Sequence, residues 1–166
     1  MSTGNLIIRE ETIADRPAVH SVNEAAFGRP DEADLVDALR SEGTVLLSLV
    51  AELDGEVAGH ILFSRMWVDA TPAVALAPMA IAPRHQRHGL GGRLIRDGLA
   101  ALRARDERIV IVVGHPKYYP RFGFSSAKAA LIESPFPREA FMAVELEPGA
   151  LDGVRGRVRY AAAFGL

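Results

Sequence analysis

The chain has 166 residues, of which 49% are hydrophobic and 24% are charged, and it contains no cysteine. This length and composition are typical of one domain with a sizeable core, so we expect residues 1–166 to form a single domain. A formal net charge of −2 disfavours binding to nucleic acid or a membrane surface, and the lack of cysteine excludes disulfides, a thiolate nucleophile and cysteine-ligated metal.

The N-terminal part predicts one strand followed by two helices. Residues 6–9 form a short apolar strand, residues 14–26 a helix that Thr12 or Asp15 could cap, and residues 31–40 a helix with an acidic first turn. No basic region followed by a long apolar core begins the sequence, and no run approaches the ~20 apolar residues of a membrane span. We therefore expect a soluble, cytoplasmic protein with no membrane partner.

Three successive strands then predict an antiparallel meander. Residues 45–53 and 57–67 flank Asp54-Gly55, which is a strong hairpin signal, and residues 74–81 form the third strand. Pro78 lies inside that third strand. Because proline cannot donate to a sheet ladder, it indicates an edge or a bulge at this point.

The remaining elements alternate between helix and strand. Apolar residues on one face, with charged residues mostly elsewhere, predict a helix over residues 89–105, and the β-branched run 109–113 predicts a strand buried on both faces. Later strands are predicted at residues 130–133, 141–146 and 158–164. The last of these is apolar and could pair with a second chain, which leaves a homodimer open.

Residues 84–92 (Arg-His-Gln-Arg-His-Gly-Leu-Gly-Gly) join an apolar strand to a helix through a basic turn that contains glycine. Free N–H groups and the helix dipole favour phosphate at such a place, and Gly89 and Gly91 allow a close approach of the backbone. The dinucleotide fingerprint is excluded because Leu94 stands where its third glycine belongs, and the Walker loop is excluded because no Gly-Lys dipeptide occurs.

Residues 86–91 (Gln-Arg-His-Gly-Leu-Gly) resemble the Gln/Arg-x-x-Gly-x-Gly/Ala signature of the GNAT N-acetyltransferase family, whose members bind acetyl-coenzyme A. Residues 119–124 (Tyr-Pro-Arg-Phe-Gly-Phe) resemble the Tyr-x-x-x-Gly-Phe ending of the family's fourth helix, and residues 114–124 resemble its YhbS-like branch. One departure is that the asparagine which many members place after the fifth strand appears here as residues 114–116 (Gly-His-Pro). No asparagine contact can therefore be carried over.

The resemblance and the order of elements imply an α/β (α+β) GNAT fold. This is a mixed, mostly antiparallel sheet of about seven strands with helices on both faces, splayed between strands four and five. In this family the fourth strand carries a bulge beside the thioester, and Pro78 next to Met79 resembles that bulge.

The resemblance also implies an activity, that of an acetyl-CoA-dependent N-acetyltransferase. Such an enzyme transfers an acetyl group to a primary amine of a small molecule or peptide by direct attack in a ternary complex. The alternative is a non-catalytic acyl-CoA-binding or sensing domain that keeps the phosphate site without turnover.

Matching the family's motifs assigns roles to individual residues. The implied coenzyme-binding residues are Met79, Ala80, Ile81, Arg84, Gln86, Arg87, His88, Gly89, Leu90, Gly91, Gly92, Tyr119 and Phe122. The backbone N–H of Met79 or Ile81 would stabilise the oxyanion, and Tyr119, with Tyr118 as the alternative, would protonate the departing thiolate. No metal is expected, because His85 and His88 lack a third ligand at suitable spacing.

The base is the least determined part of the site. A lysine-like amine has a pKa of ~10.4, so a base must remove a proton at neutral pH, and Glu24, Glu133, His115 and water all stay open for this role. Arg29, between the first two helices, could select an acidic acceptor. Phe63, Met66 and Trp67 could reach the acceptor cleft, although such residues on a strand are more often core. His60 follows Gly59 in a strand and is interpreted as structural.

Overall fold

The structure is a computed structural model that describes residues 4–166. The strands are β1 (Leu6–Glu10), β2 (Val45–Leu53), β3 (Glu56–Val68), β4 (Thr71–Ile81), β5 (Ile109–Val113), β6 (Ile132–Glu133), β7 (Phe141–Glu145) and β8 (Gly156–Arg159). The α-helices are α1 (Arg16–Phe27), α2 (Asp31–Glu42) and α3 (Leu90–Ala104). Short 3-10 turns occupy Ile13–Asp15, Pro83–His85, Tyr119–Phe122, Ala127–Ala129 and Ala162–Phe164.

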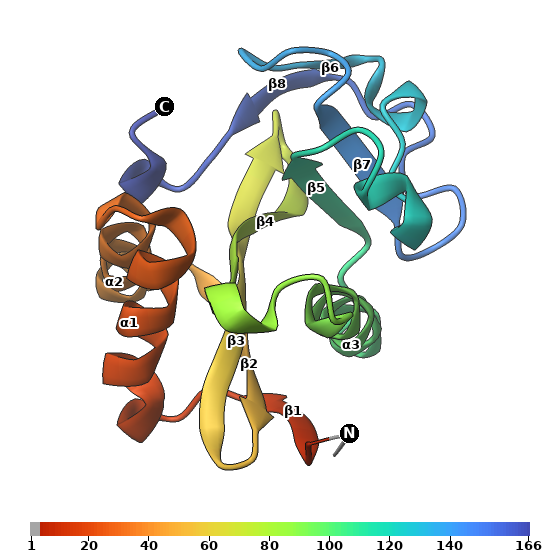
Figure 1. The fold of residues 1–166 in the computed structure, drawn as a ribbon. Helices are drawn as coiled ribbons and strands as arrows, with labels where there is room; N and C mark the ends of the chain where they lie inside the picture. Colours follow the sequence, from red (N-terminus) through yellow and green to blue (C-terminus); the bar gives the residue numbers. More distant parts are fainter. Residues whose placement is uncertain (1–3) are drawn as a thin grey trace.

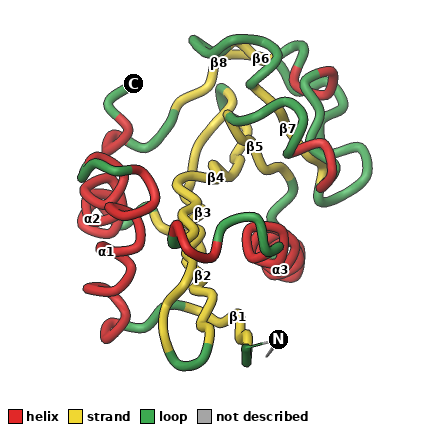
Figure 2. The backbone as a smooth tube through the Cα atoms, in the orientation of Figure 1, coloured by secondary structure: helices red, strands yellow, loops and turns green. Residues whose placement is uncertain are grey.

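The centre of the molecule is an eight-stranded mixed sheet. Its strands run in the order β1-β2-β3-β4-β5-β7, and β8 pairs with both β3 and β6. Helices α1 and α2 lie on one side of the sheet and α3 lies on the other (Figure 1). Figure 2 shows the short strands β6 and β8 arching over one end of this arrangement. The predicted mixed sheet with helices on both faces is confirmed, with eight strands in place of about seven.

Three apolar clusters explain why the layers stay together. The α3 side of the sheet buries Phe63, Leu94 and Val110 among others, and the α1–α2 side buries Val19, Leu39 and Leu62. A third cluster, beneath β6 and β8, contains Met66, Ile111 and Phe141. Burying apolar surface on both faces is the main force that stabilises such a sheet.

The hairpin between β2 and β3 has the predicted turn. Asp54 and Gly55 both have positive φ, 52° and 85°, which is the type I′ geometry that matches the twist of two antiparallel strands. Within residues 4–166, no helix combines the length and the apolarity that crossing a membrane requires.

The bulge predicted at Pro78 is also confirmed. Ile61 pairs with Met79 whereas Phe63 pairs with Leu76, so β4 advances by three residues where β3 advances by two. The extra residue falls at Ala77-Pro78, whose peptide bond is cis. As a result Leu76 before the bulge and Met79 after it both pack on the α3 side, although side chains three apart in a regular strand face opposite ways.

Two predicted elements are wrong. In place of a fourth helix, Tyr119–Phe122 form a single 3-10 turn, which Gly123 ends in the left-handed region with a φ of 93°. The strand predicted over residues 158–164 ends at Arg159, and Ala162–Phe164 form a 3-10 turn in which the Ala163 N–H donates to Glu42 Oε2 (3.2 Å). Because the apolar residues of this segment pack on their own chain, they no longer argue for pairing with a second copy.

Candidate functional site

The loop before α3 forms a row of free backbone donors. From Arg87 to Gly92, the N–H groups donate to no acceptor within residues 4–166, and the first helical bond is that of Arg93 N–H to the Gly89 carbonyl (3.1 Å). Gly89 has a φ of 85° and begins the helix in the left-handed region, where other residues are strained. Six consecutive free donors at the positive end of a 15-residue helix form a cradle for an anion.

The side chains of this loop divide into two groups. Arg87, His88 and Arg93 are exposed, and the structure gives them no carboxylate partner among the described residues. Arg84 instead pairs with Glu56 (2.8 Å), and the Gln86 side-chain amide donates to the Ile81 carbonyl (3.1 Å). The Gln86 bond therefore braces the loop, the Arg84 pair lies at the exposed surface, and the other three side chains are available to a ligand.

Beside this cradle the sheet opens between two parallel strands. The strands β4 and β5 pair only at Val74 with Val110 and at Ala75 with Ile111, so the second half of β4 has no neighbour on that side. The Ala82 N–H donates to the Ala58 carbonyl on β3 (2.8 Å). Since successive N–H groups of a strand point to alternate sides, those of Met79 and Ile81 face the opening.

Aromatic residues after β5 close over the start of α3. A Cβ atom placed on Gly91 would lie 2.8 Å from the Tyr118 hydroxyl and 3.3 Å from Met79 Cε. Phe122 packs edge-on against Tyr118 at 5.3 Å between ring centroids, and the Arg96 guanidinium stands 4.9 Å from the Phe122 ring centre. Met79, the cradle and this aromatic segment therefore meet at one place, although they are far apart in the sequence.

The second tyrosine of the segment is more enclosed. Tyr119 lies against Gly114 and packs edge-on against both Tyr118 (5.1 Å) and Phe124 (5.7 Å). Burial raises the pKa of Tyr119 to about 12. Burial also raises the pKa of Tyr118, against the opposing effect of nearby arginines. Both phenols are therefore protonated at neutral pH, and burial makes each a weaker acid than an exposed tyrosine.

The structure does not bring the candidate bases together. Glu24 lies on the surface of α1 and pairs with His20 (3.2 Å), and Glu133 lies on β6 within 3.6 Å of Arg157. His115 is exposed beyond β5, where its Nδ1 accepts the Lys117 N–H (3.2 Å). The candidates thus occupy three separate parts of the surface.

The residues considered for the acceptor site mostly pair with other residues of the chain or lie in the core. Arg29 makes two contacts to Glu32 (3.0 and 2.5 Å), so its charge is already paired. Phe63 and Met66 are fully buried, and Trp67 is half-buried beneath Arg159.

A buried polar chain connects α1 to the sheet and was missed from the sequence. Asn23 Nδ2 donates to the Val19 carbonyl (2.9 Å) and lies 3.1 Å from His60 Nδ1. Because an amide nitrogen only donates, His60 carries its proton on Nε2, which donates to Ser48 Oγ (2.8 Å). Ser48 in turn donates to Glu11 (3.2 Å). The available signal was an asparagine on the apolar face of α1, four residues after Val19.

Burial is also the main reason why the pKa of His60 is lowered to about 3, with a smaller effect of the Arg40 charge. The imidazole is neutral at neutral pH, and a group with so low a pKa is a poor base for an amine. His60 therefore holds Asn23 and Ser48 in place.

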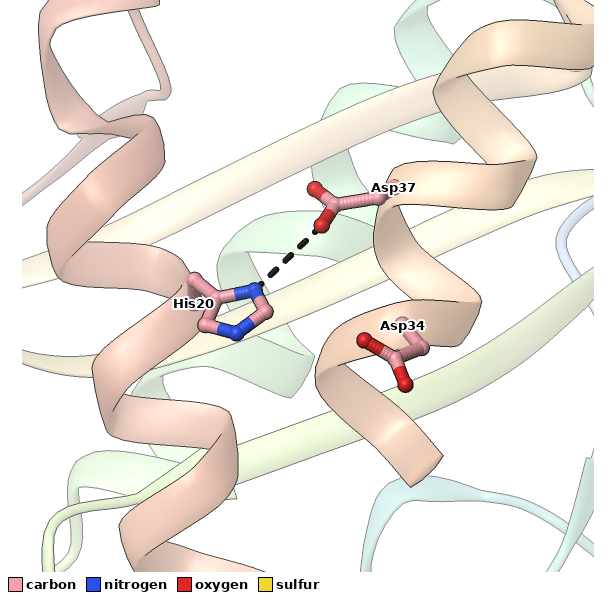
Figure 3. A group of neighbouring side chains, drawn as sticks. All are labelled: His20, Asp34 and Asp37. Atoms are coloured by element: carbon pink, nitrogen blue, oxygen red, sulfur yellow. Dashed lines mark ion pairs between the residues drawn. The ribbon is translucent and has the colours of Figure 1, made fainter. Parts of the chain in front are cut away.

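A cluster of metal-ligating side chain types lies between α1 and α2. Figure 3 shows His20 facing Asp37 across the two helices, with Asp34 beside them. His20 Nδ1 lies 3.3 Å from Asp37, and its Nε2 lies 3.2 Å from Glu24. Both nitrogens thus have carboxylate partners, Glu24 within α1 and Asp37 on α2, and we assign no metal to this group.

Taken together, the fold and the site define a class of protein: an α/β protein with an anion cradle at a helix N-terminus, next to a sheet opened between two parallel strands. A model of the acetyltransferase (GNAT) family matches residues 10–124. The chain therefore belongs to the GNAT acetyltransferase family.

Relatives support this assignment over nearly the whole chain. The chain is 34% identical to an uncharacterized N-acetyltransferase of Escherichia coli, YhbS, over 93% of its length and 96% of the relative. It is 42% identical to a second uncharacterized E. coli N-acetyltransferase, YjhQ, over 67% of its length, and this match spans 65% of YjhQ.

Two solved structures have the same fold. The crystal structure of E. coli YhbS in complex with CoA matches with a TM-score of 0.93 and 32% identity, over all of this chain and 95% of the other. A GNAT acetyltransferase from Brucella melitensis in complex with acetyl-CoA matches with a TM-score of 0.83 and 36% identity, over 97% of this chain and 99% of the other.

Proposed function

We propose that this protein is an acetyl-CoA-dependent N-acetyltransferase that acts on a primary amine of a small molecule or peptide. The observation that carries the proposal is the row of six free N–H groups from Arg87 to Gly92, next to a sheet opened along β4. The structures of relatives with CoA and acetyl-CoA support the choice of ligand. We also propose that residues 1–166 act as one domain, since β8 near the C-terminus pairs with β3.

In this proposal the cradle holds the pyrophosphate of the coenzyme. The backbone N–H groups supply hydrogen bonds, and Arg87, His88 and Arg93 supply further donors and positive charge. The pantetheine arm lies in the opening between β4 and β5. This arrangement directs the thioester toward Met79 and toward the aromatic segment after β5.

The proposed chemistry is direct attack of the amine on the thioester. The amine nitrogen forms a bond to the carbonyl carbon, and the N–H groups of Met79 and Ile81 stabilise the oxyanion from the open edge of β4. The carbon–sulfur bond then breaks, and Tyr119 donates a proton to the departing thiolate. The proton that the amine nitrogen loses passes to a base and from there, through water, back to Tyr119. Because a phenol with a pKa of about 12 is a weaker acid than a thiol (~8.5), the loss of the amine proton has to drive this transfer.

The first test is thermal unfolding with acetyl-CoA, CoA, NAD and ATP in parallel. A ligand at 100 times its Kd stabilises the folded state by about 2.7 kcal/mol, so acetyl-CoA and CoA are expected to raise the Tm and the other two are not. Equal shifts with ATP, or none with CoA, would contradict the proposal.

The second test is an amine panel read by thiol release. The chain has no cysteine, so a thiol reagent reports only the CoA that is formed. Amine-dependent release supports the enzyme. Tight coenzyme binding with no release across the panel supports the sensing domain.

A further inference from the structure

A cavity of about 400 Å³ lies on the arch at one end of the sheet. It is lined on one side by residues 133–135, which begin at the last residue of β6, and on the other by residues 157–160, with Leu166 beside them. None of these residues belongs to the proposed coenzyme site. The volume suits a ligand with an aromatic ring or a short aliphatic chain.

The walls of the cavity include rigid apolar surface. Pro135, Val158 and the ring of Tyr160 contribute to it. The Tyr160 ring is fixed edge-on by Phe136, at 6.0 Å between centroids, and also packs against Phe164 at 5.4 Å. A cavity with packed aromatic walls favours an apolar group of defined shape.

The charged residues around the cavity give it a positive character. Among the side chains that line it, two are positive, Arg157 and Arg159, and one is negative, Glu133. The Arg157–Glu133 pair is long at 3.6 Å, and its side chains are 80% and 69% exposed, so it is a weak pair. Arg159 stands 5.7 Å from the Trp67 ring centre and has no carboxylate partner within residues 4–166.

Tyr160 lines the cavity, but its hydroxyl is buried inside the protein, with no hydrogen-bond partner among the described residues. A ligand in the cavity does not reach that oxygen. The carboxylate of a ligand is therefore left to the two arginines, whose guanidinium groups are suited to carboxylates.

We propose that this cavity binds a small molecule with an apolar body and a carboxylate, held by Arg157 and Arg159. This site goes beyond the proposed acetyl transfer and does not depend on it. It provides a second ligand site on the protein, whether or not the cradle binds a coenzyme.

The experiment titrates the full chain, without coenzyme, with phenylacetate and with phenylacetamide. The two probes have nearly the same shape and differ in charge. Amide NMR signals of residues 133–134 and 157–160 are expected to shift saturably with phenylacetate, at a Kd at least about fivefold lower than that of phenylacetamide. Equal affinities, or shifts that map elsewhere, would overturn the proposal.

Variants test the residues that hold the carboxylate. The double variant Arg157→Gln/Arg159→Gln is expected to weaken phenylacetate binding by about fivefold or more. Arg155→Gln is the matched control, because Arg155 is exposed just before β8 but does not line the cavity. Urea midpoints verify that each variant is folded. Equal weakening in the Arg155 variant and in the double variant would refute the site.

Discussion

The hydroxyl of Tyr118 lies directly against the backbone of Gly91, so that even a methyl group on Gly91 would come within 2.8 Å of the oxygen. This contact joins the turn after β5 to the first turn of α3. It brings the aromatic segment and the anion cradle together, and it is easily probed because each partner can be changed by a small substitution.

We expect Gly91→Ala and Tyr118→Phe to be energetically coupled. Alanine is favoured over glycine in a helix by roughly 0.5–1 kcal/mol, but here its methyl group has to displace the Tyr118 hydroxyl. In the Tyr118→Phe background the hydroxyl is absent, so Gly91→Ala should be more favourable there by about 0.5–1 kcal/mol. Urea unfolding of the wild type, both single variants and the double variant measures the coupling. Equal effects of Gly91→Ala in both backgrounds would contradict the contact.

Replacement of Gly89 by glutamate should abolish coenzyme binding. The change places a carboxylate at the free N–H row and strains a residue with a φ of 85°. We expect the Kd for CoA, measured by calorimetry, to rise by more than about tenfold. Gly43→Glu is the matched control, because Gly43 has a similar φ of 75° and open space around it but lies at the end of α2. If the Kd for CoA rises equally in both variants, the strain of a side chain at positive φ explains the loss of binding, and the cradle assignment is wrong.

The two tyrosines should separate turnover from affinity. Tyr119→Phe removes the proposed acid and is expected to lower kcat by about tenfold or more, with coenzyme affinity nearly unchanged. Tyr118→Phe removes a hydroxyl that touches the cradle and should change coenzyme affinity more than kcat. Steady-state kinetics and direct CoA binding distinguish the two. If instead Tyr118→Phe lowers kcat and Tyr119→Phe lowers coenzyme affinity, Tyr118 is the residue that protonates the thiolate. If Tyr119→Phe lowers kcat and coenzyme affinity equally, Tyr119 has a packing role.

His60 should make the protein sensitive to acid. Its pKa is about 3 when folded against an ordinary 6.5, so between these values the unfolded chain binds a proton that the folded chain does not. This contribution to stability is complete above pH 6.5 and is lost as the pH falls, by about 2–3 kcal/mol from pH 7 to pH 4.5. Urea unfolding at the two pH values should show a smaller loss for His60→Gln than for the wild type.

The control for this measurement is His115→Gln, since His115 is exposed on the loop after β5. Carboxylates titrate in the same pH range in all three proteins, so only the difference between variants is informative. If His60→Gln loses as much stability as the wild type between the two pH values, His60 is not the group responsible.

Features that depend on neighbours along the chain could be predicted. The Asp54-Gly55 hairpin, the bulge at Pro78, the helix after Gly89 and the strand 109–113 all follow from local dihedral preferences and from the spacing of apolar residues. The cradle is of this kind, because a turn and the helix that follows it are consecutive in sequence. These local signals, with the motifs that they carry, were enough to indicate the family.

Features that depend on distant partners could not be predicted. The segment 158–164 has the composition of a strand, yet only its first part finds a partner, on β3, and the rest packs against α2. The fourth helix was replaced by a 3-10 turn, and the chain of Asn23, His60, Ser48 and Glu11 joins α1, β3, β2 and the loop after β1. Tertiary structure alone also set Tyr118 on Gly91 and left the Tyr160 hydroxyl without a partner, because burial and hydrogen bonding depend on which surfaces meet after the chain has folded.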